Sequence, residues 1–192
     1  MTQNNVGIYA SQISGHLYGG PYGAYDSLAT VTVPSGGAAS VSFTGIPNTY
    51  KHLQIRAIGR TTNTGTSGNP EIKFNGDTSA SNYTLHILYG DGSTAASYGS
   101  GTGGGSDSQI TSGSSAGANI FGAAIIDILD YASTNKYKTV RSLTGADLNG
   151  SGTMRLYSNL WLNTSAISSI TFTPTSSAIY SQYSQLALYG VK

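Results

Sequence analysis

The sequence predicts an all-β protein, a single β-sandwich of jelly-roll type with an extended N-terminal arm. Short runs of alternating apolar and polar residues recur along the chain, and turns rich in Gly, Pro, Asn and Asp separate them. Little of the chain has a helical period. Its 192 residues fit one domain, and an eight-stranded jelly roll has this size.

Ten segments have the strand pattern, and their order defines the expected sandwich. They are residues 28–33, 39–44, 50–60, 71–75, 81–89, 119–131, 136–143, 153–162, 167–173 and 185–191. Alternation predicts that one parity of each strand faces the core, as for Leu53, Ile55 and Ala57. The same rule predicts that the following residues face the core: Ile72, Phe74, Tyr83, Leu85 and Ile87. Residues 119–131 have apolar residues such as Ile125 and Ile126 on both parities, which predicts burial on both faces over part of the strand.

Two segments depart from the strand pattern. Residues 1–27 combine many glycines with tyrosines and have no period, so they form either a frayed terminus or an arm that docks on a neighbour. The remaining chain, residues 28–192, is the predicted domain. Its Gly/Ser-rich stretch at residues 90–118 is expected to be a loop.

Composition excludes several classes of protein. The chain has only 9 Lys and Arg, balanced by 8 Asp and Glu, so it lacks the basic stripe that nucleic-acid binding needs. With no Cys there are no thiolate sites or disulfides. The first 20 residues lack the charge and apolar run of a secretory signal. The longest apolar run, residues 120–126, is far shorter than a membrane span.

Metal and cofactor motifs are weak, and we expect neither group. Residues 147–152 match the first half of an EF-hand loop, but the twelfth position holds Ser158 in place of Glu. A hairpin turn is therefore favoured over a calcium site. The three histidines, His16, His52 and His86, lack the spacing of metal ligands.

Catalytic motifs are equally scarce, and the prediction is that the chain is not an enzyme. There is no nucleophile elbow, phosphate loop or dinucleotide fingerprint. Asp127 and Asp130 fit salt bridges with Arg141, Lys136 or Lys138 more simply than a pair of catalytic carboxylates. A small glycosidase or esterase would depend on a carboxylate such as Asp127.

Aromatic side chains supply the candidate contact residues. Strict alternation places Trp161 and Tyr157 on the parity opposite Met154, Leu156 and Leu160, which predicts an exposed aromatic patch. Such a patch favours a protein partner over a glycan. The full set of candidate contact residues is Tyr9, Tyr18, Tyr22, Tyr25, Tyr157 and Trp161.

Four blocks of the sequence together form a pattern: residues 46–56 (IPNTYKHLQIR), 74–77 with 89–92 (FNGD, YGDG), 126–131 with 136–139 (IDILDY, KYKT) and 186–192 (LALYGVK). Together these blocks resemble virion structural proteins of tailed bacteriophages, a group that includes β-rich capsid decoration and minor tail proteins. The group supplies no active-site residues to carry over. The resemblance implies a structural role in a virion, as an oligomer.

The resemblance and the composition lead to one expected function. It is a capsid decoration (cement) protein that bridges capsid subunits and is made in the host cytoplasm. Its expected partners are the major capsid protein and copies of itself, as a homotrimer, with no nucleic acid and no membrane. The alternative is a tail-associated or receptor-binding module that recognises host glycan through aromatics such as Tyr98. Tyr, Ser, Gly and Asn would provide adaptable contacts in either role.

Overall fold

The computed structural model describes residues 23–101, 106–107 and 111–192. These residues form fourteen β-strands and one short 3-10 helix, η1 (Ala80–Asn82). The strands are β1 (Tyr25–Thr32), β2 (Val41–Phe43), β3 (His52–Gly59), β4 (Ser67–Gly68), β5 (Glu71–Phe74), β6 (Tyr83–Gly90), β7 (Ala95–Ser100), β8 (Ser106–Asp107), β9 (Thr111–Ser112), β10 (Gly122–Leu129), β11 (Lys138–Asp147), β12 (Gly152–Trp161), β13 (Ile170–Thr173) and β14 (Gln185–Val191). Within the described residues, no helix has the length and apolar character needed to cross a membrane.

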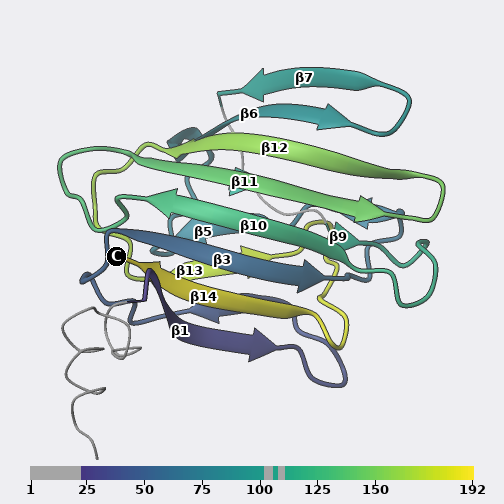
Figure 1. Ribbon diagram of the computed structural model, residues 1–192, viewed down its shortest axis with the longest axis horizontal. Helices are drawn as coiled ribbons and strands as arrows, with labels where there is room; N and C mark the ends of the chain where they lie inside the picture. Colours follow the sequence, from purple (N-terminus) through teal and green to yellow (C-terminus); the bar gives the residue numbers. More distant parts are fainter. Residues whose placement is uncertain (1–22, 102–105, 108–110) are drawn as a thin grey trace, which may run out of the picture.

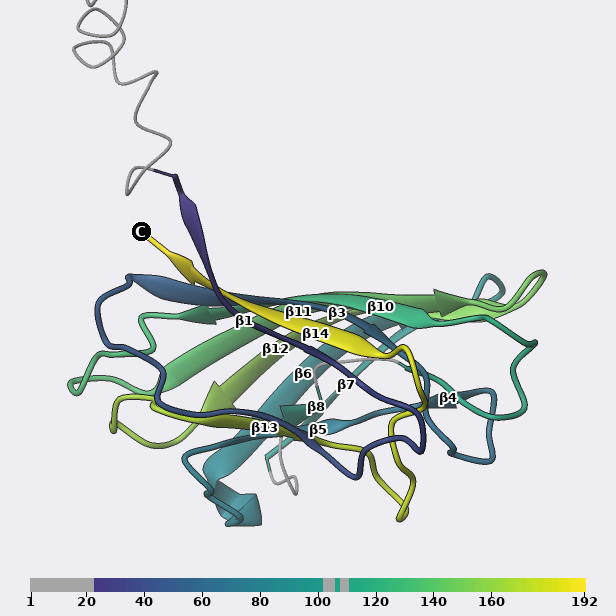
Figure 2. The same cartoon turned by 90° about the horizontal axis from the view of Figure 1, so that it is seen from below.

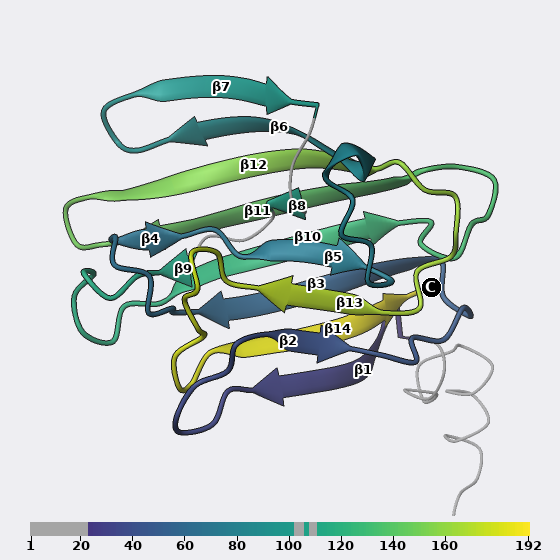
Figure 3. The same ribbon diagram turned by 180° about the vertical axis from the view of Figure 1, so that it is seen from behind.

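Two antiparallel sheets of unequal size face each other (Figure 2). The larger has eight strands in the order β1-β14-β3-β10-β11-β12-β6-β7 (Figure 1). The smaller has the order β2-β13-β5-β8 and lies against one face of the larger sheet (Figure 3). The pair β4-β9 forms a separate ribbon. The all-β class and the sandwich-like layering are thus confirmed.

The core lies between the two sheets and follows the predicted alternation. Leu53 and Ile55 of β3 are fully buried, and Ile72 and Phe74 of β5, in the opposite sheet, belong to the same buried cluster. The expected inward positions of β6 are buried as well. Since a strand with one buried face needs a period of two, these regular strands were readable from sequence.

Strand β12 packs with the opposite parity to the one expected. Trp161 and Tyr157 are buried, with 1% and 0% exposure, while Met154 and Leu156 point outward. The large rings fill core volume, as when Trp161 lies 5.5 Å from Phe74, ring centre to ring centre. The prediction that Tyr157 and Trp161 form an exposed patch is therefore wrong.

Three other expectations also need correction. Ile125 of β10 is 46% exposed, so this strand is buried on one face only. Part of the expected loop at 90–118 is strand, because Ala95–Ser100 (β7) pairs with β6 and extends the large sheet. Strand β1 begins at Tyr25, so residues 25–27 belong to the sheet and not to an arm.

Candidate protein-contact face

The eight-stranded sheet has an inner face on the core and an outer face that points away from the smaller sheet (Figure 1). Large apolar side chains project from the outer face on five adjacent strands, although a solvated sheet face usually carries polar residues. Their exposure ranges from 46% for Ile125 to 64% for Met154. We call this set the outer patch: Ile58, Leu88, Ile125, Leu143, Met154 and Leu156.

Strand register aligns the outer patch in two rows. Ile125 of β10 lies opposite Leu143 of β11, which lies opposite Leu156 and then Leu88. Side chains opposite each other on one face of an antiparallel sheet are close enough to touch. The neighbouring row adds Ile58 and, further along, Met154. The patch is therefore continuous across the middle of the sheet.

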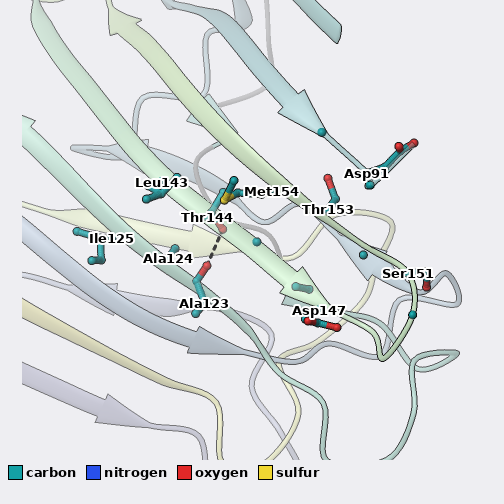
Figure 4. Close-up of a pocket in the computed structure, with 16 residues that line it drawn as sticks. Asp91, Ala123, Ala124, Ile125, Leu143, Thr144, Asp147, Ser151, Thr153 and Met154 are labelled. Carbon is teal, nitrogen blue, oxygen red and sulfur yellow. Dashed lines mark hydrogen bonds between the residues drawn. The ribbon is translucent and has the colours of Figure 1, made fainter. Parts of the chain in front are cut away.

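A shallow depression of about 810 Å³ lies at one end of the patch (Figure 4). Ala123 and Gly145, which pair with each other, provide small residues on its floor, and Leu143 and Met154 line it. The turns at Asp91 and after Asp147 also line it. Its lining contains no aromatic ring.

The row beyond the patch is polar and includes one pair of opposite charges. Asp127 of β10 lies directly opposite Arg141 of β11. The Asp127 carboxylate accepts a hydrogen bond from Gln54 Nε2 at 2.9 Å. Arg141 is exposed and forms no salt bridge among the described residues.

Towards the β1 edge, Arg56 contacts side chains of three strands on the outer face. Its guanidinium lies 5.5 Å from the centre of the Tyr25 ring and 5.1 Å from that of Tyr189. Arg56 Nε also donates a hydrogen bond to Gln54 Oε1 at 3.0 Å. The cation–π contacts join β1, β3 and β14, so Tyr25 stabilises the sheet edge while 46% of it stays exposed.

The predicted contact residues that the structure describes lie outside the outer patch. Tyr157 and Trp161 are in the interior, and the Trp161 Nε1–H donates to Asp77 Oδ2 at 2.8 Å. Tyr9, Tyr18 and Tyr22 lie outside the described residues. Of the candidate tyrosines that the structure describes, neither Tyr25 nor Tyr157 belongs to the outer patch.

The candidate carboxylates have structural partners. Asp130 binds Lys136, as predicted, and also Lys51 at 3.3 Å. Hydrogen bonds from these two ammonium groups hold the pKa of Asp130 below its ordinary value. Lys138, the other candidate partner, is buried and donates from Nζ to the carbonyls of Lys136 and Thr164. Its burial lowers the pKa of the Lys138 ammonium group.

The turn after Asp147 forms a β-hairpin, as the sequence predicts. Asn149 and Gly150 have φ of 62° and 102°, and Leu148 N–H donates to the Ser151 carbonyl at 2.9 Å. Positive φ at both central residues is the pattern of the tight hairpin turn that Asn-Gly favours. Asp147 Oδ1 accepts from Asn149 N–H at 2.9 Å, so the carboxylate closes the turn.

The histidines are apart in the described structure. His52 accepts a hydrogen bond at Nδ1 from the backbone N–H of Asp130 at 2.9 Å. His86 is exposed on β6 beside Gly99 of β7. His16 lies outside the described residues. No group of three or more His, Asp or Glu that could hold a metal occurs among the described residues.

Sequence reasoning missed the outer patch, although the chain contains a signal for it. Strands β10, β11 and β12 all have apolar residues on both parities, as with Ile125 beside Ile126 and Leu156 beside Tyr157. In a sheet that is covered on one side only, such strands must expose one of the two sets. Both-parity strands next to each other therefore indicate an apolar outer face.

Comparisons of the chain with protein-family models, with curated proteins and with solved structures found no match.

Proposed function

We propose that the chain is a structural protein of a bacteriophage virion, a capsid decoration protein that bridges capsid subunits. The observation that carries the proposal is the outer patch. A contiguous exposed apolar surface on a soluble protein marks a contact site. The resemblance to phage virion proteins assigns that contact to a particle.

The strength of one such contact suits repeated assembly. Covering a half-exposed aliphatic side chain stabilises by about 1 kcal/mol, so the six residues of the patch contribute roughly 6 kcal/mol. Fixing one molecule on another costs about 4–15 kcal/mol. A single contact is therefore weak, and repetition over a lattice supplies the avidity that a cement protein needs.

The N-terminal arm belongs to the proposal in a revised form. Its boundary now lies before Tyr25, because β1 pairs with β14 from that residue onward. Tyr9, Tyr18 and Tyr22 remain proposed capsid contacts. Removing residues 2–22 leaves β1 complete, whereas removing residues 1–27 would shorten the sheet.

Capsids of the parent particle that lack this protein provide the test. The labelled full-length chain is mixed with these capsids and, separately, with host cells. Binding to capsids that saturates at a fixed lattice stoichiometry supports the proposal. Binding to cells alone assigns the protein to receptor recognition. A variant without residues 2–22 that binds capsids as tightly as the full chain overturns the role of the arm.

The alternative function is a tail-associated module that binds host glycan. The depression beside Asp91 and Asp147 is the feature that favours it. Asp91 already accepts hydrogen bonds from Ser93 and Thr94, and Tyr98 lies outside the depression lining, which leaves little for a sugar to bind. Measurable binding of host surface polysaccharide by the isolated protein would favour this alternative.

Jelly-roll connectivity and the homotrimer also remain proposals. Jelly rolls occur in many viral capsid subunits, which agrees with the proposed role. An experimental structure of the assembled full chain tests both, through its strand connections and its symmetry.

A further inference from the structure

The outer patch is nearly self-complementary about one line in the sheet. This line runs parallel to the strands, midway between β10 and β11. On its two sides lie the register pairs Ala123 and Gly145, Ile125 and Leu143, and Asp127 and Arg141. Each pair has matching chemistry: small with small, aliphatic with aliphatic, and negative with positive.

Consider a two-fold axis that is parallel to this line and lies above it, in the plane of the contact between the two copies. Rotation about this axis places β10 of a second copy over β11 of the first. In that arrangement Ile125 meets Leu143 of the second copy, and Asp127 meets Arg141. One strand further out, β3 lies over β12, so Ile58 meets Met154. This places Ile58 of the second copy at the depression lined by Met154 and Gly145. Arg56 of β3 lies over Leu156, and this pair does not match in chemistry, although the Arg56 guanidinium is already held at the Tyr25 and Tyr189 rings.

We propose that the outer face of this chain pairs with the same face of a second copy, as a two-fold dimer packed sheet on sheet. The contact is isologous, so each complementary pair occurs twice. Two sheets that pack in this way stand about 10 Å apart, the spacing inside a β-sandwich.

The size of the face agrees with a second copy as the occupant. Five strands spaced about 4.8 Å apart and eight residues rising about 3.3 Å each cover a plane of roughly 600 Å². A standard interface buries about 800 Å² on each partner, and side-chain relief makes the accessible area larger than the plane. A small ligand would cover only the depression and leave most of the patch in water.

This dimer adds a partner to the proposed structural role and does not depend on capsid binding. Dimerisation without capsid binding would leave the inference standing and overturn the decoration role. Capsid binding by a protein that stays monomeric would do the reverse. A contact through this face alone closes at two copies, so a trimer would need a different surface.

The first experiment is sedimentation of the full-length chain over a concentration series up to roughly 100 μM, a range in which a weak dimer of micromolar affinity is populated. We expect a monomer–dimer equilibrium. Leu143→Glu should weaken it by roughly 10-fold to 100-fold, since it introduces a charge at the centre of the contact. Tyr137→Glu is the matched control, because Tyr137 is as exposed as Leu143 but lies outside the patch. A wild-type protein that stays monomeric throughout the series overturns the inference.

The second experiment uses the single charge variants Asp127→Arg and Arg141→Asp. Each variant alone sets like charges against each other across the axis and should dimerise at least about 10-fold more weakly than wild type. Mixed in equal amounts, the two variants should form a heterodimer, because the arginine introduced in the first variant then faces the aspartate introduced in the second. A charge pair within one molecule cannot produce this rescue.

The outcomes of the mixing experiment are distinct. Recovery of dimer in the mixture, with folded monomers by circular dichroism, supports the two-fold arrangement. A mixture no more dimeric than the separate variants overturns it. If removing residues 2–22 strengthens dimerisation, the arm competes for the patch, and the claim that a second copy is its main occupant is wrong.

Discussion

Replacing Asp77 with alanine removes the acceptor of three hydrogen bonds that connect η1 to the core. Asp77 Oδ2 accepts from Trp161 Nε1 and from Asn82 Nδ2, both at 2.8 Å, and Oδ1 accepts from Ser79 N–H at 2.9 Å. Trp161 is 1% exposed, so water does not readily replace its lost partner. Asn82 and Ser79 are at the surface and can bind water.

The indole nitrogen therefore determines most of the cost. A hydrogen bond to a charged acceptor contributes about 1.5–3 kcal/mol, and a buried donor without a partner costs about 1–3 kcal/mol. We expect Asp77→Ala to lower the free energy of unfolding by about 2–3 kcal/mol. For a domain of this length the melting temperature should fall by about 5–10 °C.

Urea unfolding followed by Trp fluorescence measures this loss directly, because the chain has a single Trp. Asp91→Ala is the matched control. Asp91 also accepts three hydrogen bonds, from Ser93 N–H, Ser93 Oγ and Thr94 N–H, but all of them lie in an exposed turn. We expect it to cost less than about 1 kcal/mol. Equal losses in the two variants would refute the argument that burial of Trp161 sets the magnitude.

Three further predictions follow from individual contacts. Burial raises the pKa of Asp77, but the hydrogen bonds that its carboxylate accepts outweigh burial and hold the pKa below 3.8. The contribution of Asp77 to stability is therefore present above pH 3.8 and is lost as pH falls through the folded-state pKa. The free energy of unfolding of Asp77→Asn should fall less steeply with decreasing pH than that of the wild type, and equal slopes would contradict this. Arg60 donates hydrogen bonds to the carbonyls of Ala116, Gly117 and Ile120 at 2.9–3.1 Å. Arg60→Ala should therefore speed amide hydrogen exchange in residues 113–120. Unchanged exchange would show that the loop does not need the guanidinium. A Cβ at Gly190 would lie 2.5 Å from the Tyr50 ring. Gly190→Ala should therefore destabilise the folded protein by about 1–3 kcal/mol, measured by thermal unfolding. A neutral result would mean that the ring moves freely.

The extent to which sequence predicted the fold differs between strands. β5 was predicted correctly, because its apolar residues, Ile72 and Phe74, occupy one parity only. The inner face of β3 was predicted correctly too, although Ile58 adds an apolar residue on the outer parity. β12 was not, because Leu156 and Tyr157 make both faces apolar and alternation does not say which face is inside. The deciding contact, Trp161 with Asp77, joins residues 84 positions apart.

Two further differences have the same origin in contacts that local sequence does not encode. β7 is an edge strand of small residues such as Ala95 and Gly99 and pairs through its backbone, so its composition indicates a loop. The outer patch is a property of register: Leu143, Leu156 and Leu88 become one surface only when β11, β12 and β6 are aligned. The sequence could indicate that these residues are exposed, but it could not predict that they align in one row across the strands.

Oxidative footprinting of Met154 tests most directly the central claim that the outer face is a protein-contact surface. Met154 is the most exposed member of the patch, at 64%, and Tyr183, at 69%, is a reference outside it. Hydroxyl-radical oxidation of both residues is measured by mass spectrometry in dilute protein and in the assembled protein, which is either the concentrated dimer or the capsid-bound form. We expect Met154 to be protected on assembly while Tyr183 reacts as before. Equal oxidation of Met154 in the two states would contradict the claim, whichever partner is present.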